Sequence, residues 1–216
     1  MDSFKYILGL LLLSITAFGL IFYVRTAIAS ESTDNAFPET PQDALSASVK
    51  KSSQLIPSIY DFTVQTIEGE PKALKDYRGQ ALLIVNTASL CGYTPQYRSL
   101  EELYQRFKAR GFTVLAFPAN NFLNQEPGNN AEIKNFCFRQ YKTSFPLFSK
   151  ISVKGEDIHP LYAFLTSGTK FPGPITWNFN KFLVNPKGEV IARFETPIDP
   201  LSPDIIQTIE RNLPTP

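Results

Sequence analysis

The sequence predicts an α/β domain built around a central mixed sheet. Two uncharged apolar runs, at residues 81–88 and 112–117, have the length of strands and should be buried on both faces. A helical repeat lies between them at residues 96–110, and two further strands follow at 181–185 and 189–194. A strand, a helix and a strand in succession favour parallel pairing, whereas a hairpin requires antiparallel pairing, so the sheet should contain both.

The first half of the domain should open with a hairpin. Residues 59–66 alternate loosely between apolar and polar side chains, and residues 68–70 (Glu-Gly-Glu) supply a turn. In the helix at 96–110, apolar residues recur at spacings of three and four, and basic residues fill the last turn before Gly111. The apolar positions are Leu100, Leu103, Tyr104 and Phe107.

The second half should contain two more helices and a second hairpin. Residues 130–141 form an amphipathic repeat that begins at a capping residue, Asn129 or Asn130. Residues 186–188 (Pro-Lys-Gly) form the turn between the two C-terminal strands, and a closing helix at 202–212 begins with Ser-Pro-Asp. The apolar face of the first of these helices carries Ile133, Phe136 and Cys137.

A long apolar segment precedes the domain. Residues 6–24 carry no charge and are bracketed by Lys5 and Arg25, and a helix of this length nearly matches a hydrocarbon core of about 30 Å. Residues 27–29 (Ala-Ile-Ala) also satisfy the pattern for signal cleavage. An uncleaved segment predicts a single-pass membrane protein, and a cleaved one predicts an exported or periplasmic protein. The predicted organisation is a transmembrane anchor or signal segment at 1–28, a flexible linker at 29–57 and a catalytic domain at 58–216.

The composition argues against several classes of function. Lys and Arg total 21 of the 216 residues and Asp and Glu total 20, so no broad basic surface is available for nucleic acid. Two cysteines far apart and one histidine are too few for a typical zinc or copper site. We expect neither a metal nor a cofactor.

A lone cysteine after a buried strand suits nucleophilic chemistry. Cys91 precedes the helix at 96–110, and Gly92 and Pro95 form a strand-to-helix turn that should expose the thiol. An ordinary thiol has a pKa of about 8.5, and only its thiolate attacks well. Free N–H groups at a helix N-terminus would stabilise that anion.

Three other residues could activate this thiolate without adding a competing charge. Gln125, Trp177 and Asn178 each carry an N–H donor that can reach sulfur or a peroxide oxygen. Each of these residues alone would more often serve packing or a turn, so the interpretation depends on their joint occurrence. We interpret Cys91 as the nucleophile and the other three as its activators.

The segments that carry these residues, 86–97, 125–128 and 177–178, resemble those of the glutathione peroxidase family. The resemblance extends from about residue 58 to the end of the chain. It implies a thioredoxin-like three-layer fold, a catalytic tetrad and a thiol-dependent peroxidase that acts in oxidative-stress defence. The implied tetrad is Cys91, Gln125, Trp177 and Asn178. Reduction by thioredoxin or glutathione is implied, and the short stretch at 167–175 favours a monomer.

Cys137 is the one internal candidate for a resolving cysteine, which would form a disulfide with oxidised Cys91. In relatives that recycle in this way, the resolving cysteine precedes a Phe-Pro pair by seven residues, whereas Cys137 precedes Phe145-Pro146 by eight. Some relatives carry a cysteine where this chain has Ala119. Both a resolving and a core role remain open for Cys137.

Two other functions fit part of the pattern. A membrane-tethered thiol–disulfide oxidoreductase would require a second cysteine close to Cys91, but residues 92–94 are Gly, Tyr and Thr. A non-catalytic peroxide sensor would not require all four tetrad residues. The substrate could be hydrogen peroxide or an organic or lipid hydroperoxide. His159, just before Pro160 in a predicted loop, should have a surface or capping role.

Overall fold

A four-stranded mixed sheet lies at the centre of the residues that the computed structural model describes, 58–214. The strand order is β4, β3, β5, β6. β3 pairs in parallel with β4 and antiparallel with β5, which pairs antiparallel with β6. The strands are β3 (Ala81–Thr87), β4 (Phe112–Pro118), β5 (Lys181–Val184) and β6 (Val190–Phe194). The predicted mixed sheet is confirmed.

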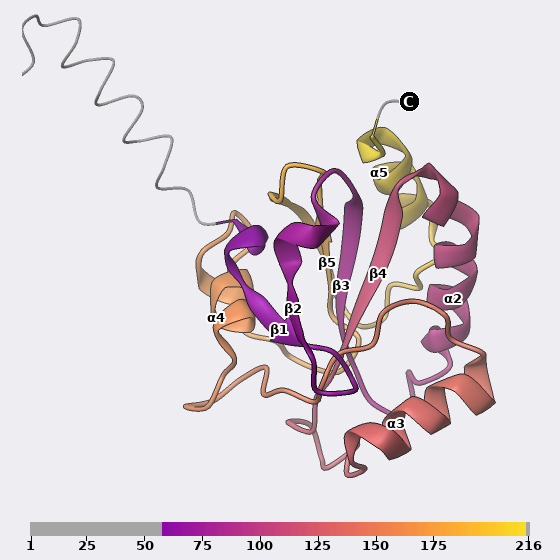
Figure 1. Cartoon of the computed structure of the whole chain (residues 1–216), viewed down its shortest axis with the longest axis vertical. Coiled ribbons are helices and arrows are strands. Elements are labelled where there is room, and N and C mark those ends of the chain that lie inside the picture. Colours follow the sequence, from indigo (N-terminus) through magenta and orange to yellow (C-terminus); the bar gives the residue numbers. More distant parts are fainter. Residues whose placement is uncertain (1–57, 215–216) are drawn as a thin grey trace, which may run out of the picture. The chain divides into compact units, whose positions relative to one another are not determined.

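Helices cover both faces of this sheet. Figure 1 shows α2 and α5 on one side and α4 on the other. A 3₁₀ turn, η3, extends α2, and a π-helical turn, η4, extends α3. The bounds are α2 (Gln96–Phe107), η3 (Lys108–Arg110), α3 (Asn130–Phe136), η4 (Cys137–Tyr141), α4 (Pro160–Ser167) and α5 (Pro203–Asn212).

Successive side chains of β3 enter two different hydrophobic cores. Leu83 and Val85 pack with residues of α2 and α5, whereas Leu82 and Ile84 pack with residues of α4. All seven residues of β3 are buried, as expected for a strand with both faces covered. The result is the predicted three-layer arrangement.

A short hairpin precedes the sheet, but its first strand begins later than predicted. β1 (Thr63–Gln65) pairs antiparallel with β2 (Pro71–Ala73). Ile59–Asp61 form a 3₁₀ turn, η1, instead of a strand, because Ser58 makes a capping box with the last residue of that turn. A second 3₁₀ turn, η2 (Leu74–Tyr77), follows β2.

The predicted helix ends are largely confirmed. Gly111 adopts φ of 80°, the left-handed conformation that ends α2 and η3. Asn129 caps α3 through a capping box with Glu132. Ser202 occupies the N-cap position of α5, but its side chain makes no capping hydrogen bond.

His159 lies just outside regular structure, as predicted, but the sequence analysis missed the helix that follows it. α4 begins at Pro160, a residue suited to the first helical position because it lacks an N–H donor. His159 Nδ1 accepts a hydrogen bond from the Leu161 N–H at 3.2 Å, which confirms its capping role. Leu161, Tyr162 and Leu165 bury one face of the helix.

The predicted anchor or signal segment (1–28) and linker (29–57) lie outside the described residues. Among the helices of residues 58–214, none has the length and apolar character needed to cross a membrane.

Three connections meet at one edge of the sheet. The chain leaves the parallel strands β3 and β4 at the same edge. β5 runs the other way, so the segment that precedes Lys181 arrives at that edge, where Lys181 pairs with Val85. This topology brings together three connections that carry predicted site residues: Cys91, Gln125 and Asn178.

Candidate active site

Cys91 lies in a tight turn between β3 and α2. Its N–H donates to Thr94 Oγ1 at 2.9 Å, and the same hydroxyl donates to the Ala88 carbonyl at 2.9 Å. The Thr94 N–H donates back to the Cys91 carbonyl at 3.0 Å. These three bonds fix the backbone of Cys91 at the end of the strand.

The Cys91 side chain is less exposed than the sequence analysis predicted. Only 7% of its surface is exposed, because the side chain packs into the core under α2, whereas Gly92 and Tyr93 are exposed. Its Sγ accepts a hydrogen bond from the Tyr93 N–H at 3.4 Å. A backbone donor in this position stabilises negative charge on sulfur. The sequence indicated such a donor only through the position of Cys91 before a helix.

Gln125 and Asn178 meet directly. Asn178 Nδ2 donates to Gln125 Oε1 at 2.9 Å, across 53 positions of sequence. The Gln125 carbonyl in turn accepts a hydrogen bond from the N–H of Leu90, the neighbour of Cys91, at 3.0 Å. Asn178 is fully buried and Gln125 is half-buried. The amide pair is therefore tied to the turn that carries the thiol.

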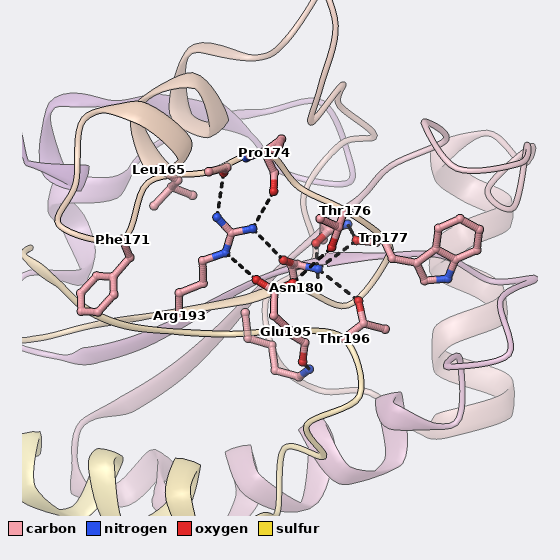
Figure 2. A network of polar contacts seen from close by, with 12 residues as sticks. Leu165, Phe171, Pro174, Thr176, Trp177, Asn180, Arg193, Glu195 and Thr196 are labelled. Carbon is pink, nitrogen blue, oxygen red and sulfur yellow. Dashed lines mark hydrogen bonds and ion pairs between the residues drawn. The ribbon is translucent and has the colours of Figure 1, made fainter.

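The Trp177 side chain packs against the loop that carries Gln125. The indole packs against Phe122, on the loop of Gln125, with ring centroids 5.5 Å apart. The main-chain carbonyl of Trp177 points the other way and accepts hydrogen bonds from Asn86 and Asn180. In Figure 2 the indole extends away from the polar network that holds this carbonyl.

The structure thus links the predicted tetrad residues only in part. It joins Gln125 to Asn178 and joins the Gln125 loop to Trp177 and to the neighbour of Cys91. Within residues 58–214, none of the three predicted activators donates a side-chain hydrogen bond to the sulfur, whose donor is a backbone N–H.

Cys137 is a free, fully buried thiol in the same hydrophobic core as Cys91. Burial raises the pKa of Cys137 to about 11, and the neighbouring Tyr97 hydroxyl partly opposes this shift. Cys137 begins the π-helical turn η4. Its thiol is therefore protonated at neutral pH and inaccessible while this turn is intact.

Glu126 is a buried carboxyl that the sequence analysis missed. Its side chain is 1% exposed, and burial raises its pKa from 4.5 to about 7, although Ser89 and Lys150 oppose the shift. Glu126 Oε2 and Ser89 Oγ both lack a hydrogen-bond partner among the described residues. The adjacency of Glu126 to Gln125 was the one sequence signal, and it gave no indication of burial.

A metal-binding site requires several ligand side chains close together. No cluster of three or more His, Cys, Asp or Glu side chains is placed to hold a metal ion anywhere between residues 58 and 214.

Comparison with known proteins identifies the family. Residues 59–166 match the family model described as glutathione peroxidase. The chain is 52% identical over 146 residues to a glutathione peroxidase homolog, BsaA, of Halalkalibacterium halodurans, covering 67% of this chain and 93% of that protein. The chain belongs to the glutathione peroxidase family.

Other relatives are named for different peroxide-reducing activities. A hydroperoxy fatty acid reductase of Synechocystis is 51% identical over 147 residues, covering 63% of this chain and 86% of the relative. A glutathione peroxidase-like peroxiredoxin of Schizosaccharomyces pombe is 48% identical over 139 residues, covering 63% and 88%. As a member of this family, the protein is a thiol-dependent peroxidase.

Solved structures agree with the family and the fold. The crystal structure of Trgpx in its apo form is 36% identical, with a TM-score of 0.57, and covers 74% of this chain and 99% of that one. A thioredoxin-family thiol:disulfide interchange protein of Chlorobium tepidum is 17% identical, with a TM-score of 0.51, covering 70% and 92%. The second similarity shows the thioredoxin-like fold alone and does not make this glutathione peroxidase homologue a disulfide oxidoreductase.

Proposed function

We propose that Cys91 is the residue that attacks the peroxide and that Gln125, Trp177 and Asn178 assist it. The observation that carries this proposal is the meeting of the Cys91 turn with the amide pair, through the 3.0 Å bond from the Leu90 N–H to the Gln125 carbonyl. Gln125 and Asn178 are uncharged, so they can hydrogen-bond an anion without competing for its proton.

In the proposed reaction the Cys91 thiolate attacks one oxygen of the peroxide. The O–O bond breaks, and the second oxygen leaves with its substituent and takes up a proton to give water or an alcohol. Cys91 is oxidised to a sulfenic acid. The Tyr93 N–H stabilises the thiolate before attack, and the side-chain donors of the tetrad would stabilise the leaving oxygen.

Cys137 is our proposed resolving residue, because it shares a hydrophobic core with Cys91. Its thiol would lose a proton and attack the sulfenic sulfur; the S–O bond breaks, the departing hydroxide takes up that proton to give water, and a disulfide forms. An external dithiol would then reduce this disulfide to two thiols and would itself be oxidised to a disulfide. The burial of Cys137 requires local opening of η4 before this step. Thioredoxin is the reductant we favour, because a disulfide between Cys91 and Cys137 would be opened by an external dithiol; glutathione is the alternative.

We propose lipid hydroperoxides as substrates alongside hydrogen peroxide. The relative named hydroperoxy fatty acid reductase supports this choice, as does the apolar segment at residues 6–24. In this proposal residues 1–28 anchor the domain to a membrane or direct its export, and residues 29–57 act as a tether. The catalytic domain would act as a monomer.

The first experiment is a steady-state peroxide-consumption assay on Cys91→Ser, with Cys137→Ser as the matched control. Cys91→Ser should abolish turnover because an alcohol cannot replace the thiolate, whereas Cys137→Ser should still consume about one equivalent of peroxide in the first step. Full activity of Cys91→Ser would refute the assignment. If the wild-type protein reacts once with peroxide but shows no turnover with any thiol donor, a non-catalytic peroxide sensor is favoured.

Comparison of phospholipid hydroperoxide with hydrogen peroxide, with thioredoxin and glutathione as rival donors, would define the substrate and the reductant. Alkaline extraction of membranes from cells that express the full chain would test the anchor. Release of the protein by this treatment would contradict a membrane-spanning segment.

A further inference from the structure

The segment that carries Trp177 and Asn178 contains a strained residue. Phe179 has φ of 63°, a left-handed conformation that is unfavourable for a non-glycine residue. Its ring is buried edge-to-face against Tyr97, with centroids 5.6 Å apart, and its carbonyl accepts a hydrogen bond from Lys181 Nζ at 2.7 Å. A strained residue persists only where its surroundings hold it from several sides.

Asn86 holds this segment from β3. Its carbonyl accepts a hydrogen bond from the Phe179 N–H at 2.6 Å, and its Oδ1 accepts one from the Asn180 N–H at 3.0 Å. Its Nδ2 donates to the Trp177 carbonyl at 3.0 Å. Asn86 lies near the end of β3, from which the chain runs directly to Cys91. One side chain therefore connects the strand that carries the thiol to the segment that carries the activators.

Arg193 holds the same segment from β6, as Figure 2 shows. Its two terminal nitrogens donate to the carbonyls of Gly173 and Pro174, both at 2.7 Å, and one of them also donates to Asn180 Oδ1 at 3.1 Å. Its Nε lies 3.1 Å from Glu195 Oε1. The Arg193 side chain is only 10% exposed, so its contacts are shielded from water.

Asn180 connects these two supports. Its Nδ2 donates to the Trp177 carbonyl at 3.3 Å and to Thr196 Oγ1 at 3.1 Å. Thr196 Oγ1 donates to the Asn178 carbonyl at 2.7 Å. These bonds hold the main-chain carbonyls of Trp177 and Asn178. The side chains of both residues face the Gln125 loop. We refer to three side chains as the clamp: Asn86 and Asn180, which are buried, and Arg193, which is largely covered.

We propose that the clamp positions Trp177 and Asn178 for the peroxidase reaction by holding the strained backbone between them and β5. Between residues 58 and 214, none of the three clamp side chains makes a hydrogen bond to the Cys91 sulfur. The clamp residues are therefore positioning residues. The inference rests on the proposed roles of Trp177 and Asn178.

The test uses Asn180→Asp and Asn180→Ala. The aspartate keeps an acceptor for Arg193 but cannot donate to the Trp177 carbonyl, so it separates positioning from folding. Stopped-flow kinetics of the reduced enzyme should show a rate constant with peroxide that is roughly 10- to 100-fold lower in both variants. The fluorescence emission of Trp177, the sole tryptophan, should shift. The matched control is Thr113→Val, which removes a partly buried 2.6 Å bond to Gln80 at the opposite end of the sheet and should change neither readout.

A double-mutant cycle distinguishes this inference from the proposed function. If the clamp acts through the two activators, Asn180→Ala should cost much less in a variant that already carries Trp177→Phe and Asn178→Ala. Additive losses, or folded Asn180 variants with the wild-type rate and emission, would overturn the inference. A wild-type rate for the Trp177→Phe, Asn178→Ala variant itself would instead refute the proposed roles of these two residues.

Discussion

The Cys91 N–H donates a 2.9 Å hydrogen bond to the hydroxyl of Thr94, three residues further along the chain. The same hydroxyl donates to the Ala88 carbonyl, so one small side chain satisfies a buried donor and a buried acceptor on opposite sides of the nucleophile. Thr94 itself is 5% exposed, and water cannot easily replace it.

Replacement of Thr94 should therefore affect both stability and catalysis. Thr94→Val keeps the shape but leaves two buried polar groups unpaired, which should lower the free energy of unfolding by about 1–3 kcal/mol and slow the peroxide reaction. Thr94→Ser retains the hydroxyl and serves as the control. Urea denaturation and stopped-flow kinetics would check both effects, and identical behaviour of the two variants would argue against this role for the hydroxyl.

A second prediction concerns the amide pair. Asn178→Asp replaces the donor to Gln125 with a carboxylate, which would draw the Gln125 Nε2 donor toward itself and place negative charge beside the residue whose carbonyl bonds the Cys91 turn. We expect the rate constant with peroxide to fall roughly 100-fold or more, the size of effect seen when a single anion-stabilising donor is lost. Asn135→Asp, which adds the same charge at an exposed position on α3, should have little effect. Equal rates for the two variants would contradict a role for the amide pair in the reaction.

A third prediction concerns the reactivity of Cys137. In Cys91→Ser at pH 8, iodoacetamide should modify Cys137 roughly 100-fold more slowly than an unfolded thiol, because burial raises its pKa to about 11. Urea should remove this protection. Rapid modification of the folded variant would show that the thiol is accessible without opening of η4.

Mass spectrometry after one equivalent of peroxide tests the resolving role of Cys137 itself. We expect a disulfide between Cys91 and Cys137 that forms after the sulfenic acid, since the buried thiol must first become accessible. A persistent sulfenic acid, or only a mixed disulfide with an added thiol, would assign reduction to an external thiol.

A fourth prediction follows from Glu126. Its pKa in the folded protein, about 7, lies above its ordinary value of 4.5, so between these values the folded state binds more protons than the unfolded state. Its contribution to stability is therefore full below about pH 4.5 and falls as pH rises to about 7. Glu126→Gln should remove this pH dependence, a change of about 1–3 kcal/mol between pH 5 and pH 8.

Urea denaturation at several pH values would measure the effect of Glu126→Gln. Glu102→Gln is the control, because Glu102 is exposed on α2 and its replacement removes a carboxyl of the same type. If both variants kept the wild-type pH dependence, Glu126 would not be the group responsible.

The sequence alone determined the elements whose signals are local. The uninterrupted apolar runs predicted β3 and β4, and the spacing of apolar residues with Gly111 predicted α2 and its end. A capping residue, Asn129 or Asn130, predicted the start of α3, and the capping box that Asn129 forms there spans only four residues. Cys91 could be recognised as a candidate nucleophile from its neighbours, because strand, turn and helix follow one another within a short stretch.

Tertiary contacts decided what local patterns could not encode. The burial of Cys91 depends on the core under α2, and the bond between Asn178 and Gln125 joins positions far apart in sequence. The raised pKa of Glu126 depends on desolvation, which arises only once the loop after β4 is packed. The clamp likewise requires Asn86 of β3 and Arg193 of β6 to converge on Asn180. Desolvation and long-range hydrogen bonding exist only in the folded chain, so only the three-dimensional arrangement could determine these features.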